Sequence, residues 1–305
     1  MYQSKIKKQR FVILVFLAFA TVSPSMSTGN LAHAKHLQET YVPAEDLIDQ
    51  PYGVHDRQRF DIYLPEGRSV ASTPVLFLIH GGGWTSGSKS HYKAQINRLQ
   101  TVFPQMAFVA VGYRLADGKE KTNQFPAQEE DVKACIEYVM NNRSTYGVSG
   151  KFATYGGSAG AHLAMLYAYK YGKSSYKAAG VVSLAGPPNI STVFGQVMTT
   201  DNPDKEVYFG WFVNGVGGTP EEKPELCYTS SPINYVTPDS PPTLLLYKAG
   251  DPVVPRQQAD ELAAKLTSCG VEHTYRLYPG QNHDFSDVRA ETFQELVDFL
   301  NTYLK

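Results

Sequence analysis

A serine framed by two glycines is the residue of this chain best suited to act as a nucleophile. Ser158 stands in Gly156-Gly157-Ser158-Ala159-Gly160, directly after the mainly apolar stretch 151–155. The G-x-S-x-G spacing puts a serine on a sharp, strained turn from a strand into a helix, with its hydroxyl exposed. Glycines two positions away are needed because side chains there would collide where strand and helix pass each other. A plain strand-to-helix turn is the alternative, since the pattern alone is a weak signal.

An acid and a base stand at corresponding places later in the chain. Asp251 follows the apolar run 243–247, and His283 follows the strand-like run 273–278. If these runs are parallel strands, the turns after them meet Ser158 at one edge of the sheet. His283 could then take the serine proton and return it to a leaving group, while Asp251 holds the imidazole in the required tautomer. Asp284 is the alternative acid, but its position next to the base leaves it poorly placed to orient the ring.

A glycine loop supplies candidate donors for the oxygen of an acyl substrate. His80-Gly81-Gly82-Gly83-Trp84 follows the continuous apolar run 74–79, which predicts a strand covered on both faces. The loop therefore leaves bare backbone N–H groups at the carboxyl edge of the sheet. We expect the N–H groups of Gly82, Gly83 and Ala159 to form an oxyanion hole, in which each donor lowers the barrier by roughly 3 kcal/mol. A merely flexible loop is the alternative.

Strands and helices that alternate along the chain predict the scaffold for these groups. Such alternation after an initial β segment indicates an α/β fold with a mostly parallel, doubly wound sheet flanked by helices. Residues 35–305 are expected to form one domain, because no linker or repeat interrupts them. We predict strands at 59–65, 74–79, 107–111, 151–155, 179–184, 243–247 and 273–278, and helices at 125–141, 159–171, 256–268 and 288–303.

The segment 186–232 breaks this alternation. It is too long for a plain loop in a compact domain, so we predict an insertion with short helices of its own. Because it leaves the strand after Ser158, it is expected to arch over the serine as a small cap. Its aromatic residues include Trp211 and Phe212, which together with Trp84 we expect to contact an acyl group or a sugar ring. The alternative is that these aromatics only pack the insertion onto the body.

Several polar side chains are expected to be structural. Arg114 ends one strand and Asp131 begins the helix after it, which predicts an ion pair between them. His162 lies one turn into the helix after Ser158 and is expected to be packed. His91 and His273 are expected at surface or strand positions.

Charge and cysteine content exclude other classes of function. The chain has 28 basic and 29 acidic residues, and loss of the four cations near its N-terminus would leave a net charge of −5. Such a protein has no basic footprint for nucleic acid or an anionic membrane. The three cysteines lack the spacing of a zinc site and no nucleotide motif is found, so neither a metal nor another cofactor is expected. Cys135 is expected to be buried, and Cys227 could pair with Cys269.

The first residues differ from the rest of the chain. Four basic residues between positions 5 and 10 precede the apolar run 11–20, and small and polar residues follow. This order is typical of a secretory signal peptide, and the run is shorter than the ~20 residues of a membrane-spanning helix. We predict a signal peptide at 1–34, cleaved after positions 32–34, and a secreted or periplasmic mature protein. Cleavage after positions 25–27 and an uncleaved membrane tether are the alternatives.

With these motifs in place, the chain resembles a known family. Its four motifs are similar to those of α/β-hydrolase carboxylesterases, above all the hormone-sensitive-lipase-like esterases and the secreted feruloyl- and acetyl-esterase-like group. The resemblance runs from about Tyr52 to the C-terminus and implies the order serine, acid, base in the chain. The motifs are His80-Gly81-Gly82-Gly83-Trp84, Gly156-Gly157-Ser158-Ala159-Gly160, Gly250-Asp251-Pro252-Val253-Val254-Pro255 and Asn282-His283-Asp284-Phe285.

The function that the resemblance implies is that of a secreted serine carboxylesterase. Its partner would be a small ester, with acetyl or aromatic-acyl groups on plant carbohydrate as the expected substrates. The aromatic residue after the glycines also resembles kynurenine formamidases, so an amidase or formamidase is one alternative. A non-catalytic binding protein of the same fold is another. Such proteins typically lose the serine or the histidine, and this chain keeps Ser158, Asp251 and His283.

Overall fold

The computed structural model describes residues 42–172 and 176–305. The predicted signal peptide at 1–34 and its cleavage sites lie outside these residues. Within the described ranges, no helix is both long and apolar enough to cross a membrane.

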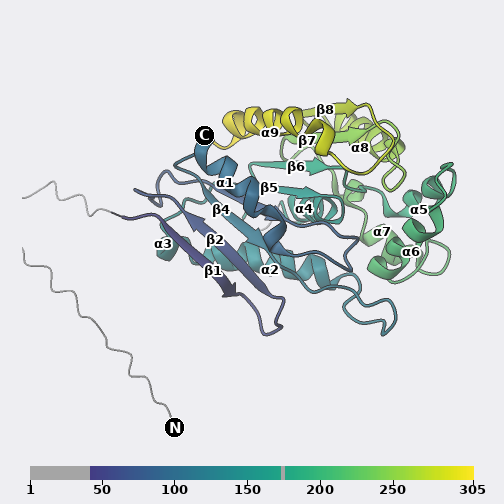
Figure 1. Ribbon diagram of the computed structural model, residues 1–305, viewed down its shortest axis with the longest axis horizontal. Coiled ribbons are helices and arrows are strands. Elements are labelled where there is room, and N and C mark those ends of the chain that lie inside the picture. Colours follow the sequence, from purple (N-terminus) through teal and green to yellow (C-terminus); the bar gives the residue numbers. More distant parts are fainter. Residues whose placement is uncertain (1–41, 173–175) are drawn as a thin grey trace, which may run out of the picture. The chain divides into compact units, whose positions relative to one another are not determined.

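One sheet of eight strands organises the described chain (Figure 1). Its order is β1-β2-β4-β3-β5-β6-β7-β8. Strand β2 runs antiparallel to its neighbours β1 and β4, and all the other neighbours are parallel. The predicted mostly parallel α/β fold is therefore confirmed. The strands are β1 (Glu45–Pro51), β2 (Arg59–Leu64), β3 (Val75–Ile79), β4 (Ala107–Val111), β5 (Phe152–Gly157), β6 (Gly180–Leu184), β7 (Thr243–Lys248) and β8 (His273–Tyr278).

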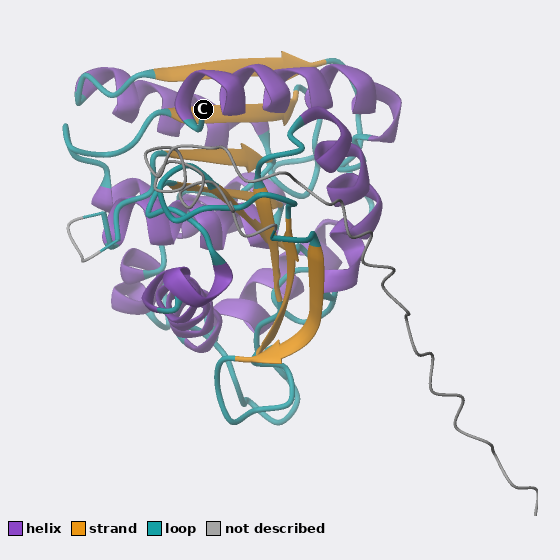
Figure 2. Ribbon diagram, turned by 90° about the vertical axis from the view of Figure 1, so that its left-hand side faces the viewer, coloured by secondary structure: helices purple, strands orange, loops and turns teal. Residues whose placement is uncertain are grey.

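Helices cover both faces of this sheet (Figure 2). Side chains alternate along each strand, so Val75, Phe77 and Ile79 of β3 enter one core layer while Leu76 and Leu78 enter the other. The first layer packs against α2, α3, α4 and α8, and the second against α1 and α9. These helices are α1 (Lys93–Val102), α2 (Ala127–Asn141), α3 (Arg143–Tyr146), α4 (Ala159–Lys170), α8 (Arg256–Ser268) and α9 (Arg289–Tyr303).

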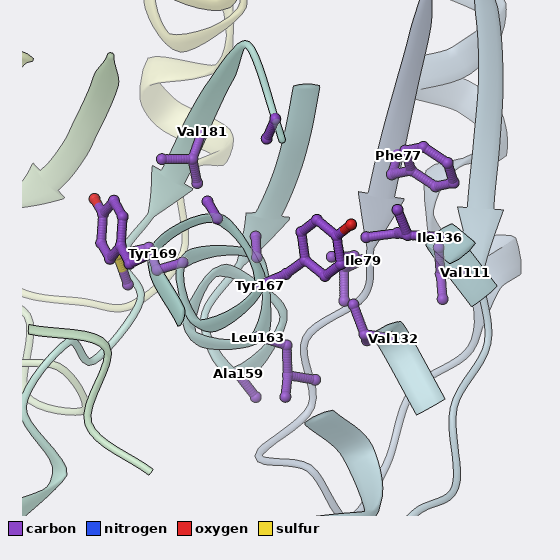
Figure 3. Packing of buried hydrophobic residues seen from close by; sticks show 14 of the residues in the cluster. Phe77, Ile79, Val111, Val132, Ile136, Ala159, Leu163, Tyr167, Tyr169 and Val181 are labelled. Carbon is purple, nitrogen blue, oxygen red and sulfur yellow. The ribbon is translucent and has the colours of Figure 1, made fainter. Parts of the chain in front are cut away.

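Helix α4, which begins directly after Ser158, is the most deeply buried of the helices. Every residue from Ala159 to Tyr169 is buried. Figure 3 shows Leu163 and Tyr167 on the side of α4 toward Ile79 of β3 and Val132 of α2. Each fully buried large side chain contributes about 1.5–3 kcal/mol. The first turn of α4 is thus held by core packing on several sides.

Strand β1 and the helices α1 and α3 were not predicted from the sequence. Strand β1 has no buried residue, so it lacks the apolar alternation that marks a half-buried strand. It forms because it pairs with β2 along the edge of the sheet. Helix α1 buries only Ile96 and Leu99, which is too weak a periodicity to recognise among its polar residues.

The predicted insertion is confirmed as a helical segment. It contains α5 (Ile190–Met198), α6 (Lys205–Val216) and α7 (Pro224–Thr229). Figure 1 shows these helices beyond the carboxyl ends of β5 and β6.

The cysteines are unpaired. Cys135 is buried as expected, and Cys227 and Cys269 do not form the disulfide that the sequence left open. Within residues 42–172 and 176–305, no three His, Cys, Asp or Glu side chains are grouped so that they could hold a metal ion.

The predicted ion pair between Arg114 and Asp131 is confirmed. The Asp131 carboxylate is 1% exposed and lies 2.7 Å from the Arg114 guanidinium. It also accepts the Arg114 backbone N–H at 2.7 Å and the Gln58 side-chain amide at 2.7 Å. The Asp131 hydrogen bond is the main reason why the pKa of Arg114 is raised. This carboxylate therefore ties the end of β4 to the start of α2.

Replacing Asp131 with alanine should lower the free energy of unfolding by about 3 kcal/mol, because it leaves buried donors without an acceptor. Glu130→Ala is the matched control. Glu130 lies 3.4 Å from the same guanidinium but its side chain is 62% exposed, so its loss should cost at most about 1 kcal/mol. Urea unfolding of both variants measures the difference. If Asp131→Ala unfolds like the wild type, the structural role assigned to Asp131 is wrong.

Candidate active site

Ser158 lies on the turn between β5 and α4 in a strained conformation, with φ 54° and ψ −125°. A Cβ atom at Gly156 would lie 2.3 Å from the carbonyl carbon of Gly160. A Cβ atom at Gly160 would lie 2.0 Å from the carbonyl oxygen of Ile79. Neither position can accept a side chain, which is the physical reason for the glycine spacing. The Ser158 N–H donates to the Leu184 carbonyl at 2.7 Å and so fixes the turn against β6.

Asp251 and His283 come together from the loops after β7 and β8. The His283 Nδ1 lies 2.6 Å from the Asp251 Oδ2. The other carboxylate oxygen, Oδ1, accepts the N–H groups of Val253 at 2.9 Å and Val254 at 3.0 Å. The Asp251 side chain is fully buried, whereas 23% of the His283 side chain is exposed. The acid is therefore held rigidly from behind, and the imidazole keeps one side open.

Ser158 and His283 line the same cavity, whose volume is about 480 Å³. Tyr155 of β5 and Phe285 in the loop after β8 also contribute to its wall. No hydrogen bond joins the side chains of Ser158 and His283, both of which belong to the described residues. Contacts between catalytic groups often become short only when substrate is bound. The structure thus places Ser158 and the imidazole of His283 at one cavity, while the buried Asp251 carboxylate contacts the imidazole from outside that cavity.

The glycine loop lies beside the serine. Gly82 and Gly83 have φ values of 115° and 58°, a region that favours glycine. Within the described chain, the N–H groups of Gly82, Gly83 and Ala159 donate to no backbone carbonyl. Gly82 lines the cavity, while Ala159 is the first residue of α4. These N–H groups therefore have no backbone acceptor in the structure, and their role as an oxyanion hole stays a prediction.

A buried lysine, Lys248, contacts the loop that carries His283, and it was not singled out from the sequence. The Lys248 side chain is 0% exposed at the end of β7. Its Nζ donates to Asn282 Oδ1 at 2.8 Å and to the Asp284 carbonyl, and it forms an ion pair with Asp287 at 2.6 Å. It thereby holds the residues on both sides of His283. The only sequence signal is a cation at the end of the apolar run 243–247.

His80, the residue directly before the three glycines, anchors the glycine loop by its buried ring. Its ring is fully buried and stacks on Tyr113, with the ring centroids 4.1 Å apart. The Tyr113 hydroxyl donates to the His80 carbonyl at 2.7 Å. Burial lowers the pKa of His80 to about 4. The ring is therefore neutral at ordinary pH and serves as packing for the loop.

Two of the three aromatics predicted to contact substrate are buried instead. Trp84 is 4% and Phe212 is 3% exposed, and their ring centroids lie 5.6 Å apart. The Trp84 indole N–H donates to His162 Nδ1 at 3.2 Å, and His162 Nε2 contacts the Ser230 carbonyl at 2.6 Å. His162 is packed, as expected. Trp84 of the glycine loop and Phe212 of α6 therefore pack against each other and join the insertion to the body.

His162 should make the fold sensitive to acid. Burial lowers its pKa to about 4, against about 6.5 for an unfolded histidine. Between these values the unfolded state binds more protons, so stability is lost as the pH falls from about 6.5 to about 4, at up to ~1.4 kcal/mol per pH unit. His162→Gln can keep both hydrogen bonds but cannot titrate, so its loss of stability in this window should be smaller. Urea unfolding across this range measures both slopes; equal slopes would contradict the assignment.

The predicted cap does not line the cavity that holds Ser158. Of the predicted aromatics only Trp211 is accessible, at 39% exposure. Its side chain lies against Gly83 and its ring centroid is 5.1 Å from that of Tyr208. The cavity wall instead contains His91, which is at the surface as expected, and residues of α1 and α9. The insertion therefore flanks the glycine loop rather than covering the cavity.

Comparison with known proteins identifies related sequences and folds. The model of the BD-FAE family matches residues 60–266. Esterase LipQ of Mycobacterium tuberculosis is 29% identical over 285 residues, which is 89% of this chain. The chain spans 65% of the length of LipQ, and 58% and 56% of two further mycobacterial relatives.

Solved structures share the fold. A truncated carbohydrate esterase from gut microbiota superimposes with a TM-score of 0.70 at 24% identity, covering 88% of this chain and 98% of that one. The carboxylesterase EstE1, cloned from a metagenomic library, gives a TM-score of 0.69 at 23% identity, covering 90% and 94%. At these identities the likeness establishes the fold alone.

Proposed function

Since this chain belongs to the BD-FAE family and has the α/β-hydrolase fold, we propose that it is a serine carboxylesterase that cleaves small acyl esters. One observation carries the proposal. The strained turn bearing Ser158 opens into the same cavity as His283, whose ring is held at 2.6 Å by the buried Asp251. The esterase names of relatives such as LipQ support it.

The proposed reaction proceeds through an acyl-enzyme. The Ser158 hydroxyl attacks the ester carbonyl carbon while His283 takes its proton, and the carbonyl oxygen becomes an anion facing the N–H groups of Gly82, Gly83 and Ala159. Collapse of this intermediate breaks the bond to the alcohol, which receives the proton from His283. Water then attacks the acyl carbon, gives its proton to His283 and releases the acid as Ser158 recovers its hydrogen.

The expected substrates are acetyl or aromatic-acyl esters of carbohydrate. The related fold of a carbohydrate esterase supports this choice. The cavity of about 480 Å³ has room for a monosaccharide or a phenolic acyl group, and Tyr155 and Phe285 on its wall offer apolar contact. Export, directed by the predicted signal peptide at 1–34, would place the enzyme where such polymers occur.

A substrate panel tests the proposal. It contains 4-nitrophenyl acetate, acetylated and feruloylated saccharides, and a matched amide and formamide. Faster turnover of esters than of the amides is the expected result. Preference for the formamide would favour the formamidase alternative, and absence of turnover on the whole panel would favour a binding protein.

Trp211 should influence the choice of acyl group. It is exposed and lies against Gly83, a proposed oxyanion donor. Trp211→Ala should change the ratio of kcat/KM between feruloyl and acetyl esters by about three- to tenfold, because a single aromatic contact is lost. Tyr228→Ala, an exposed aromatic of α7, is the control. A uniform loss on all esters with a lower Tm would instead make Trp211 part of the packing.

A further inference from the structure

We propose that the cavity beside Ser158 contains a carboxylate-binding subsite, formed by Arg98 of α1 and Arg289 of α9, and that the preferred esters carry an anionic carboxylate. This inference rests on the proposed esterase function and narrows its substrate class. The carboxylate could belong to the alcohol, as in a uronic acid, or to the acyl part, as in a dicarboxylic half ester. Both present the same group to the arginines.

The two arginines face the serine's own cavity. Arg98 and Arg289 line it together with Ser158 and His283. They come from helices far apart in the sequence that cover the same face of the sheet. The guanidinium carbon of Arg98 lies 4.0 Å from the ring centroid of Phe293, which also lines the cavity. This stacking holds the group in place while leaving its N–H donors free.

Neither arginine has a hydrogen-bond or ion-pair partner of its own. In residues 42–172 and 176–305, Arg98 and Arg289 make no side-chain hydrogen bond and no ion pair. The other seven arginines of these ranges all do. Their partners are Gly87 for Arg57, Asp49 for Arg59, Glu45 for Arg68, Asp131 for Arg114, Met140 for Arg143, Asp260 for Arg256 and Glu295 for Arg276. The two free guanidinium groups are thus concentrated at the candidate active site.

The charged side chains on the wall of the cavity favour binding of an anionic group. Besides the two arginines, the lining contains His91, His283 and one acid, Asp284. The Asp284 carboxylate is already engaged by the Ser286 N–H at 2.9 Å and the Ser286 hydroxyl at 2.6 Å. Two fixed positive charges therefore oppose one occupied negative charge. Such a cavity raises the local concentration of anionic substrates, even though the chain as a whole carries a net charge of −1.

A carboxylate is the anion that fits an ester substrate. A guanidinium presents planar, paired N–H donors that match the two oxygens of a carboxylate. Phe285 and Tyr155 on the same wall can pack against the ring of a sugar or an aryl group that bears it. Esters of neutral alcohols and acids would leave the two guanidinium groups with only the Asp284 carboxylate, which already interacts with Arg289, as a counter-charge.

Matched pairs of substrates test the subsite with the full-length protein. One pair compares an acetylated galacturonic acid with the same acetylated galactose, and the other compares the mono-4-nitrophenyl ester of glutaric acid with 4-nitrophenyl pentanoate. In at least one pair, kcat/KM should be about tenfold higher for the charged member. The favoured pair identifies whether the carboxylate lies on the alcohol or the acyl part. The preference should shrink at about 0.5 M salt.

Single substitutions test whether the preference for charged substrates comes from Arg98 and Arg289. Arg98→Gln and Arg289→Gln should each lower the charged-to-neutral ratio about tenfold. Arg143→Gln removes an exposed arginine from α3, which precedes β5 and so lies at the opposite edge of the sheet, and should leave the ratio unchanged. A ratio near one for both pairs, in an enzyme that cleaves 4-nitrophenyl acetate, would overturn the subsite but not the esterase assignment.

A binding measurement keeps the test independent of turnover. Calorimetric titration of Ser158→Ala with galacturonate and with glutarate should show saturable binding that is lost in the double variant with Arg98→Gln. If 4-nitrophenyl acetate is not cleaved at all, the proposed function fails while this titration still decides the subsite. Equal binding of galacturonate and galactose, together with no binding of glutarate, would overturn it.

Discussion

Ser158→Ala should lower kcat/KM for every ester by about 10⁴-fold or more, because it removes the only atom that forms the acyl bond. The fold should be unchanged. The Ser158 side chain makes no hydrogen bond in the structure, and its N–H bond to Leu184, at 2.7 Å, does not depend on the hydroxyl. Thermal unfolding and kinetics on the same preparation measure both quantities.

Ser268→Ala is the matched control for this variant. Ser268 ends α8, which begins after the loop of Asp251 and runs back along the sheet, so its hydroxyl contacts only the end of its own helix. Its loss should leave kinetics unchanged. A purified Ser158→Ala protein that kept a tenth of the wild-type activity would disprove the assignment of the nucleophile.

Asp251→Asn should lower kcat by roughly 10⁴-fold with little change in structure. Asp251 Oδ1 accepts the N–H groups of Val253 and Val254, so the amide oxygen of an asparagine must take that position. The amide nitrogen then faces His283 Nδ1, where Oδ2 now lies at 2.6 Å. Two donors cannot face each other, so the ring proton moves to Nε2. In that tautomer the imidazole cannot accept the serine proton.

Comparing Asp284→Asn with Asp251→Asn shows which of the two candidate acids orients His283. Asp284 is exposed and its carboxylate is bound to Ser286 rather than to His283. We expect it to lose less than about tenfold in kcat on a neutral ester, far less than Asp251→Asn. The pair of variants is compared on 4-nitrophenyl acetate at saturating concentration. Similar losses in both would mean that the acid role is shared, against the geometry.

The sequence by itself was enough to predict the scaffold and the order of the candidate catalytic groups. Both rest on local physical requirements. Buried parallel strands such as β3 and β7 need continuous apolar runs, and the turn at Ser158 needs glycine at 156 and 160 because a Cβ atom would meet backbone at 2.0–2.3 Å. Since parallel strands end at one edge, the residues after them meet there whatever lies between them.

Elements and contacts without a local pattern were found only in the structure. Strand β1 exists through its pairing with β2, and Lys248 is recognised as an anchor only when Asn282 and Asp287 are seen around its ammonium. Likewise, nothing in the sequence distinguishes buried Trp84 and Phe212 from exposed Trp211. Exposure is decided by how the insertion docks on the body.

Which residues line the cavity around Ser158 was also decided by the tertiary structure alone. From the sequence, the insertion was expected to cover the serine, whereas the cavity is bounded by α1 and α9. A cavity is the space that distant elements leave between them, so its lining depends on where helices dock and not on any one segment's pattern. Arg98 and Arg289 are nearly two hundred positions apart, and only the common sheet face that their helices cover makes them neighbours of the nucleophile.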